Sequence, residues 1–237
     1  MACRAIFLDF DDTLHDFRGA YDRAFARGAA MVCAAAMVDA AELQRRCQAP
    51  WAASWEDFVG GRCDETGLWS ARTASVLEQA GLARDHPAGR DFTDRYVAAM
   101  RAELRLFPDT AAALDLVETV RPRPRLGILT NGPRSVQRER IGHLGLAARV
   151  DFIVVSGELG TAKPDPLFFQ TALGLAGCTA ADAVMIGDNP VADIAGAKAA
   201  GLRAVWLDRA GDGWSGPDPG PDIACGDLVA AVRWALG

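Results

Sequence analysis

The chain has 237 residues, half of them hydrophobic, which is enough for one large domain or for a core domain with a smaller insertion. Its net charge of −6 and its scattered basic residues argue against a nucleic-acid-binding protein. No apolar run reaches membrane-spanning length, and a predicted strand begins too early to leave room for a signal peptide. We therefore expect a cytoplasmic protein that binds neither a nucleic acid polymer nor a membrane.

The first predicted element is a strand over residues 5–8 that is followed at once by acids. The strand is apolar and free of Gly and Pro, as expected of a strand buried on both faces of a parallel sheet. Asp9 and Asp11 lie just beyond its carboxyl end, where open α/β sheets bind ligands. Two carboxylates this close share a site only if a cation is bound or one stays protonated. Alone, the stretch is equally typical of a loop that caps a helix.

Residues 17–99 have the pattern of an inserted helical domain. Apolar residues recur three and four apart, and no further junction of a strand with acids appears. Several aromatic residues crowd one part of this section. They form either the core of the helical bundle or the wall of a substrate pocket: Trp51, Trp55, Phe58 and Trp69.

Strands and helices alternate after this section. This alternation predicts an α/β fold whose core is a parallel sheet with right-handed crossovers. The core domain would comprise residues 1–16 and 100–237. Strands are expected over residues 126–129, 152–155, 183–186 and 204–207, and helices over residues 110–120, 136–144 and 166–176 and from about residue 227.

Polar residues follow several of these strands, and their chemistry fits together. Thr130 and Asn131 offer a hydroxyl and an amide for a phosphate oxygen, and Lys163, one of only two lysines, offers a point charge. Asp188 and Asp193 supply further hard oxygen ligands of the kind that Mg²⁺ prefers. Each residue alone is compatible with an ordinary turn or helix start. Together, at the ends of predicted strands, they indicate one site.

The ordered set resembles the motifs of the haloacid dehalogenase-like hydrolases over nearly the whole chain. The resemblance is carried by Asp9-Phe10-Asp11-Asp12-Thr13, Thr130-Asn131, Lys163-Pro164, and Gly187-Asp188 followed by Asp193. It implies a Rossmann-like core with a helical cap inserted between the first and second motifs.

The resemblance also implies a role for each residue. Asp9 would be the nucleophile that forms an aspartyl-phosphate, and Asp11 the general acid and then the base that activates water. Mg²⁺ would be held by the Asp9 side chain, the Asp11 backbone carbonyl and Asp188, with Asp193 acting through water or through its neighbours. The phosphoryl group would be bound by Thr130, Asn131 and Lys163.

The reaction within the family is narrowed by three observations. Relatives that remove halogens replace the second acid, whereas Asp11 is retained here. Relatives that hydrolyse phosphonates need a lysine in the cap, and residues 17–99 contain none. We find no cap signature of a sugar-phosphate mutase. A Mg²⁺-dependent phosphatase is therefore favoured over a haloacid dehalogenase, a phosphotransferase or a catalytically silent scaffold. An oxidoreductase is disfavoured because no Gly-x-Gly-x-x-Gly follows the first strand.

The substrate is less determined by the sequence. A nucleotide, a sugar phosphate or a small phosphorylated biosynthetic intermediate would each suit, and the protein would act as a monomer or homodimer. His15, just after the first motif, and Arg62, beside Gly60-Gly61, are candidate substrate contacts. The alternatives are a packed histidine and a solvated surface arginine.

Overall fold

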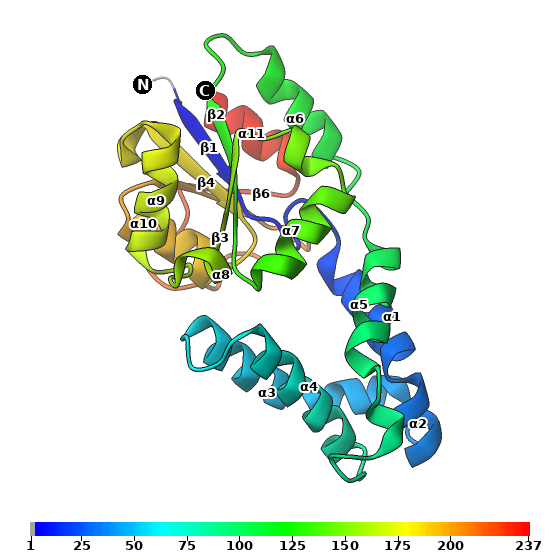
Figure 1. Cartoon of the computed structure of the whole chain (residues 1–237). Coiled ribbons are helices and arrows are strands. Elements are labelled where there is room, and N and C mark those ends of the chain that lie inside the picture. Colours follow the sequence, from blue (N-terminus) through cyan, green and yellow to red (C-terminus); the bar gives the residue numbers. More distant parts are fainter. Residues whose placement is uncertain (1–2) are drawn as a thin grey trace. The chain divides into compact units, whose positions relative to one another are not determined.

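The chain divides into two compact units in a computed structural model that describes residues 3–237 (Figure 1). The core unit comprises the chain up to Asp16 together with Arg105–Gly237, and the helical unit comprises Phe17–Leu104. Met1 and Ala2, which the sequence analysis assigns to the core domain, lie outside the described residues. The expected boundary after residue 99 falls inside helix α5, Phe92–Glu103, so the helical unit continues to the end of that helix.

The core unit is built on a six-stranded sheet in which every pairing is parallel. The strand order is β3-β2-β1-β4-β5-β6, which places β1 in the interior of the sheet. The predicted α/β fold with a parallel sheet, and with a helical insert between its first two strands, is confirmed. The strands are β1 Ala5–Leu8, β2 Arg125–Thr130, β3 Phe152–Val155, β4 Ala183–Gly187, β5 Arg203–Leu207 and β6 Ile223–Cys225.

Helices cover both faces of this sheet, as the alternation of buried side chains along β1 requires. Ile6 and Leu8 pack into a cluster with α6, α7 and α11, whereas Ala5 and Phe7 pack into a second cluster with α9 and α10. The helices are α6 Thr110–Thr119, α7 Arg134–His143, α8 Ser156–Leu159, α9 Pro166–Ala176, α10 Gly196–Ala199 and α11 Leu228–Leu236, with shorter turns η2 Leu146–Ala148, η3 Ala180–Asp182 and η4 Pro190–Ala195.

The sequence analysis does not include the edge strand β6. Three residues are too short for an alternating pattern to stand out, and they directly follow a Gly- and Pro-rich loop. The strand forms because Leu207 of β5 pairs with Cys225 and Val205 pairs with Ile223.

The helical unit is held together by contacts between aromatic rings. Tyr21, Phe25, Trp51, Phe92 and Tyr96 lie within 5.5–6.4 Å of one another in several edge-to-face pairs. Trp51 is buried, so this tryptophan belongs to the bundle core. The helices are α1 Phe17–Gly28, α2 Ala30–Ala36, α3 Ala40–Val59, α4 Glu65–Gln79, η1 Pro87–Gly89 and α5 Phe92–Glu103.

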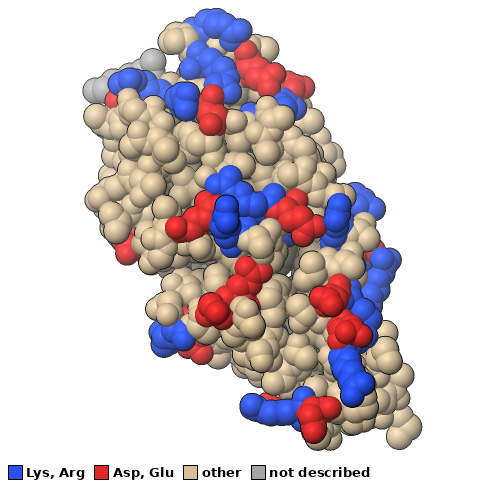
Figure 2. Space-filling view, viewed as in Figure 1, with Lys and Arg blue, Asp and Glu red and all other residues tan. Residues whose placement is uncertain are grey.

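Positive and negative side chains are interspersed on the face shown in Figure 2. This distribution matches the scattered charges of the sequence. Within residues 3–237, every helix is too short or too polar to cross a lipid bilayer.

Candidate active site

Asp9 lies at the carboxyl end of the sheet between two neighbouring strands. Leu8, the last residue of β1, is in register with Ile128 on β2 and Ile186 on β4. The Asp9 backbone N–H continues the ladder by donating to the Ile186 carbonyl at 2.9 Å. The residue is 7% exposed. The strand thus fixes a carboxylate in a nearly dry position.

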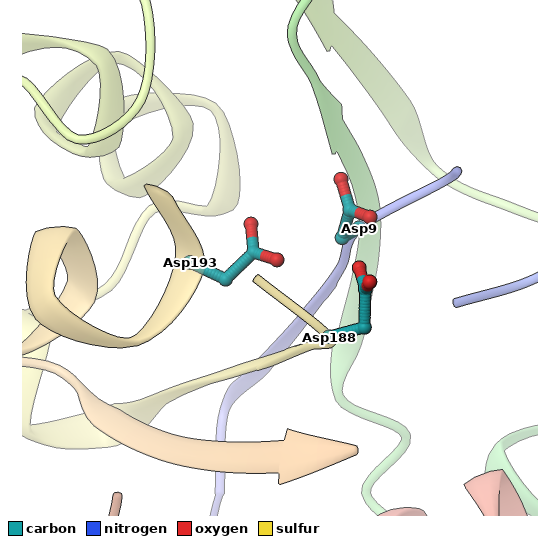
Figure 3. A group of neighbouring side chains, drawn as sticks. All are labelled: Asp9, Asp188 and Asp193. Atoms are coloured by element: carbon teal, nitrogen blue, oxygen red, sulfur yellow. The ribbon is translucent and has the colours of Figure 1, made fainter. Parts of the chain in front are cut away.

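Three carboxylates converge at this end of the sheet (Figure 3). Asp9 follows β1, Asp188 follows β4, and Asp193 comes from the turn η4 that begins after Asn189. One carboxylate oxygen of each lies within 4.8 Å of those of the other two. The structure therefore brings together Asp9 and Asp188, which the sequence analysis assigns to the metal, and Asp193, to which it gives a supporting role.

Lys163 lies between two of these acids. Its Nζ donates to Asp9 Oδ1 and to Asp193 Oδ1, each at 2.6 Å, and to the Leu129 carbonyl at 2.9 Å. The residue is 3% exposed, so all three donors of its ammonium group are used in a dry environment. The interaction fixes the orientation of the Asp9 carboxylate.

Asn131 holds the loop that carries Lys163. Its Nδ2 donates to the Lys163 carbonyl at 2.8 Å, and its Oδ1 accepts from the Lys163 backbone N–H at 2.9 Å. This reciprocal pair uses Oδ1 and one N–H of the amide that the sequence analysis assigns to a phosphate oxygen, and the second N–H of Nδ2 is not part of it. The observed contacts make Asn131 a support for Lys163.

The local fold around Asp193 depends on a glycine and a helix cap. A Cβ on Gly187 would lie 2.2 Å from Asp193 Oδ2, so only glycine permits this approach. Asn189 caps η4 by accepting from Val191 and Ala192, and its own N–H donates to Asp193 Oδ2 at 3.0 Å. Both Asp193 oxygens thereby accept hydrogen bonds from the protein.

Burial and neighbouring charges shift the pKa values of Asp9 and Lys163. Burial raises the pKa of Asp9 well above its ordinary value, and the carboxylate of Asp193 raises it further, against the opposing effect of Lys163. Burial alone would lower the pKa of Lys163, but Asp193 and Asp9 outweigh it and raise that pKa. Lys163 is therefore charged at neutral pH.

The residues in the pocket fit a divalent cation. Three carboxylates and one ammonium leave an excess of two negative charges when all are ionised. Oxygen donors at this spacing suit Mg²⁺, whose positive charge would balance this excess.

Asp11 lies in a different environment although it is only two residues from Asp9. Its carboxylate forms an ion pair with Arg140 on α7, lies 2.8 Å from His15 Nε2, and accepts from Gln137 Nε2 at 3.1 Å. Gln137 also donates to Thr130 Oγ1 at 2.5 Å. Helix α7 thus joins Asp11 to the end of β2.

These partners hold Asp11 as a carboxylate. Burial by itself would raise the pKa of Asp11, but the Arg140 guanidinium and His15 outweigh it and bring the pKa below its ordinary value. Asp11 is therefore deprotonated at neutral pH in this arrangement and carries no proton to donate.

The two candidate substrate contacts from the sequence have other partners in the structure. His15 is fully buried, and its ring lies 4.4 Å from that of Phe10. Arg62 is exposed and its Nε donates to Asp57 at 2.6 Å within the helical unit. These positions do not support a direct contact with substrate.

Gln137 and Arg140 are absent from the residues singled out by the sequence analysis. Arg140 is one of 23 arginines, and Gln137 belongs to no quoted motif. Their spacing of three places both side chains on one face of α7, but the sequence does not show that this face meets Asp11.

Comparison with known proteins assigns the chain to a family. The model of the haloacid dehalogenase-like hydrolases matches residues 3–201. The chain belongs to this family. The predicted resemblance is therefore confirmed, and the helical unit is the insertion expected between the first and second motifs.

Two curated relatives of this hydrolase are phosphatases. It is 39% identical to a phosphoserine phosphatase of Thermus thermophilus over 65% of the chain and 59% of that relative. It is 30% identical to an N-acylneuraminate-9-phosphatase of Rattus norvegicus over 88% of the chain and 84% of that relative. A magnesium-bound HAD-hydrolase of Bacillus subtilis has the same fold, with a TM-score of 0.77, 21% identity and 99% of both chains covered.

Proposed function

We propose that this hydrolase is a Mg²⁺-dependent phosphatase that hydrolyses a small phosphate monoester through an aspartyl-phosphate on Asp9. The observation that carries the proposal is the hydrogen bonding of the Lys163 ammonium to both Asp9 and Asp193 at the end of β1. This geometry orients a carboxylate in a dry pocket and supplies a cation beside it. Both features favour attack on an anionic phosphoryl group.

Asp9 would act as the nucleophile. Lys163 holds its Oδ1, and among the described residues Oδ2 has no hydrogen-bond donor. An oxygen of Asp9 attacks phosphorus, the bond to the leaving-group oxygen breaks, and a phosphoryl-aspartate remains. The positive charge of Lys163 would stabilise the negative charge on the phosphoryl oxygens, and the Thr130 hydroxyl would help to orient them.

Asp11 would complete the proton transfers. It donates a proton to the departing oxygen, and the resulting carboxylate then takes a proton from the water that attacks phosphorus. That second attack breaks the bond to Asp9 and releases inorganic phosphate. Because Asp11 is ion-paired with Arg140 in this structure, the first transfer requires it to exchange Arg140 for the substrate oxygen.

Mg²⁺ would be held by Asp9, Asp188 and the backbone carbonyl of Asp11, with Asp193 supporting through Lys163 and Asn189. When bound, it supplies positive charge for the phosphoryl oxygens and for the excess carboxylates of the pocket. The protein contributes the fixed orientation of the acids and the low exposure of the site.

The substrate would be a small phosphorylated metabolite. The two curated relatives are named for phosphoserine and for N-acylneuraminate 9-phosphate, and others for pyrimidine nucleotides and glyceraldehyde 3-phosphate. These names span an amino acid, a sugar acid, a nucleotide and a triose. They support the ester class without selecting one member.

The test is hydrolysis of an aryl phosphate by the purified full-length chain, with Mg²⁺ and with a chelator. We expect turnover that requires Mg²⁺ and is lost in Asp9→Asn. A panel of phosphorylated metabolites then ranks substrates by kcat/KM. Release of halide from a 2-haloacid in place of phosphate would establish a dehalogenase, and transfer to an added alcohol would establish a phosphotransferase. No turnover with any of these would favour a silent scaffold.

A further inference from the structure

Arg72 in the helical unit is surrounded by aromatic rings. Its guanidinium carbon lies 4.7 Å from the ring centroid of Trp51, 5.4 Å from that of Trp69 and 5.9 Å from that of Trp55. Trp51 and Trp55 lie one turn apart on α3, and Trp69 and Arg72 lie one turn apart on α4. These two helices pack against each other (Figure 1). The site is thus formed by two adjacent helix faces.

The guanidinium of Arg72 lacks an acceptor. Its Nε is buried without a hydrogen-bond partner, and within residues 3–237 no carboxylate or carbonyl oxygen pairs with the group. Other arginines of the same unit are paired: Arg62 with Asp57, Arg84 with Glu78, and Arg23 with Glu103. Those three are more than 40% exposed, where a partner contributes least. The arginine that would gain most from an anion is therefore the unpaired one.

The aromatic rings do not neutralise Arg72. Their faces attract the cation, which explains why it lies among them, but they provide no acceptor in the plane of its N–H groups. Tyr21, which interacts electrostatically with Arg72, is uncharged at neutral pH because burial raises its pKa to about 12. The group therefore keeps one uncompensated positive charge beside apolar walls.

We propose that Arg72 and the half-buried indoles of Trp55 and Trp69 form a binding site for the carboxylate of an organic monoanion. A carboxylate matches the planar guanidinium by accepting two parallel N–H bonds, and its single charge matches that of Arg72. The indoles would contact the apolar body of the ligand. The carboxylate belongs to a separate small metabolite that the helical unit binds by itself.

The first experiment measures binding of a free carboxylate by calorimetry on the full chain. Benzoate is compared with the neutral benzamide at constant ionic strength. We expect benzoate to bind the wild type and Arg72→Met to lose at least about tenfold in affinity, since two charge-assisted hydrogen bonds are removed. Arg72→Lys, which keeps the charge but not the fork, should be intermediate. Arg84→Met removes an exposed arginine of the same unit and serves as the control. Thermal unfolding verifies that each variant is folded.

The second experiment measures hydrolysis of 4-carboxyphenyl phosphate and of 4-carbamoylphenyl phosphate by the wild type. It tests the proposed function independently of the Arg72 site.

The two proposals fail in distinguishable ways. Unchanged benzoate affinity in folded Arg72→Met overturns the carboxylate site and leaves the phosphatase proposal intact. If the wild type hydrolyses neither ester, the proposed function fails, and the benzoate measurement alone then decides the Arg72 site.

Discussion

Asp9 and Asp11 are two residues apart in the chain and lie in pockets of opposite electrostatic character. The pocket of Asp9 holds two further acids and one lysine, and the pKa of Asp9 is raised. The pocket of Asp11 holds an arginine and a histidine, and the pKa of Asp11 is lowered. The net charge of the surroundings therefore differs between the two carboxylates. The first pocket has an excess of negative charge that suits a metal and the second is already compensated by the protein.

Removing the nucleophile should have the largest effect. We expect Asp9→Asn to lose activity by about 10⁴-fold, because an amide cannot form the phosphoryl intermediate. Steady-state hydrolysis of an aryl phosphate measures this loss. Asp165→Asn, an exposed helix cap two residues from Lys163, should keep wild-type rates. Residual activity of more than a few per cent in Asp9→Asn would assign the nucleophile to another residue.

Removing the cation of the Asp9 pocket should have the largest effect on stability. Lys163→Met leaves Asp9 and Asp193 buried beside each other, which should lower the free energy of unfolding by about 3–5 kcal/mol. Urea denaturation without metal measures it. The other lysine provides a matched control: Lys198 pairs with Asp222 at 2.7 Å in a more exposed position, and Lys198→Met should cost within about 1 kcal/mol. Equal losses in both variants would contradict the assigned importance of the pocket.

Binding of Mg²⁺ should balance the excess negative charge of the Asp9 pocket and so stabilise the folded protein. At a Mg²⁺ concentration a hundred times its Kd, the wild type should gain about 2.7 kcal/mol of unfolding free energy. Asp9→Asn should lose most of this gain because one ligand is replaced by an amide. Differential scanning calorimetry with Mg²⁺ and with a chelator gives both values. A gain that is the same in both proteins would place the ion elsewhere.

The sequence predicts the first pocket better than the second for a physical reason. Asp9, Asp188 and Lys163 follow predicted strands or the loops beside them, and the carboxyl ends of parallel strands must meet. Their convergence follows from the topology alone. Arg140 and Gln137 lie on a helix, and their contact with Asp11 depends on the rotation of α7 against the sheet. Arg72 is similar, because its surroundings depend on how α3 packs on α4.

The same distinction applies to the fold. Strands whose residues are all buried, such as β1 and β4, follow their apolar runs. The edge strand β6 is partly exposed and three residues long, so pairing with β5 defines it more than its own sequence does.

Removing the arginine of the Asp11 pocket should have the smallest of these effects on stability, and the effect should depend on pH. Arg140→Met should lower the free energy of unfolding by about 2 kcal/mol at pH 7, less than at Lys163 because the Asp11 side chain is 27% exposed. A lowered folded-state pKa means that this stabilisation is fully present above the unfolded pKa of about 3.9 and is lost as pH falls through the folded value. The gap between the wild type and Arg140→Met should therefore be constant near neutrality and close in acid.

The matched control for this variant lies on the same helix. Arg138 pairs with Glu158 at 2.8 Å in a more exposed position, so Arg138→Met should cost less than about 1 kcal/mol. Urea denaturation of the wild type, Arg140→Met and Arg138→Met between pH 3 and pH 7 gives the differences in the free energy of unfolding. This pH range includes the unfolded pKa of about 3.9. A gap for Arg140→Met that widens in acid would have the wrong sign for a carboxylate stabilised by Arg140. A gap that stays constant down to pH 3 would mean that Arg140 does not hold Asp11 as a carboxylate in the folded chain.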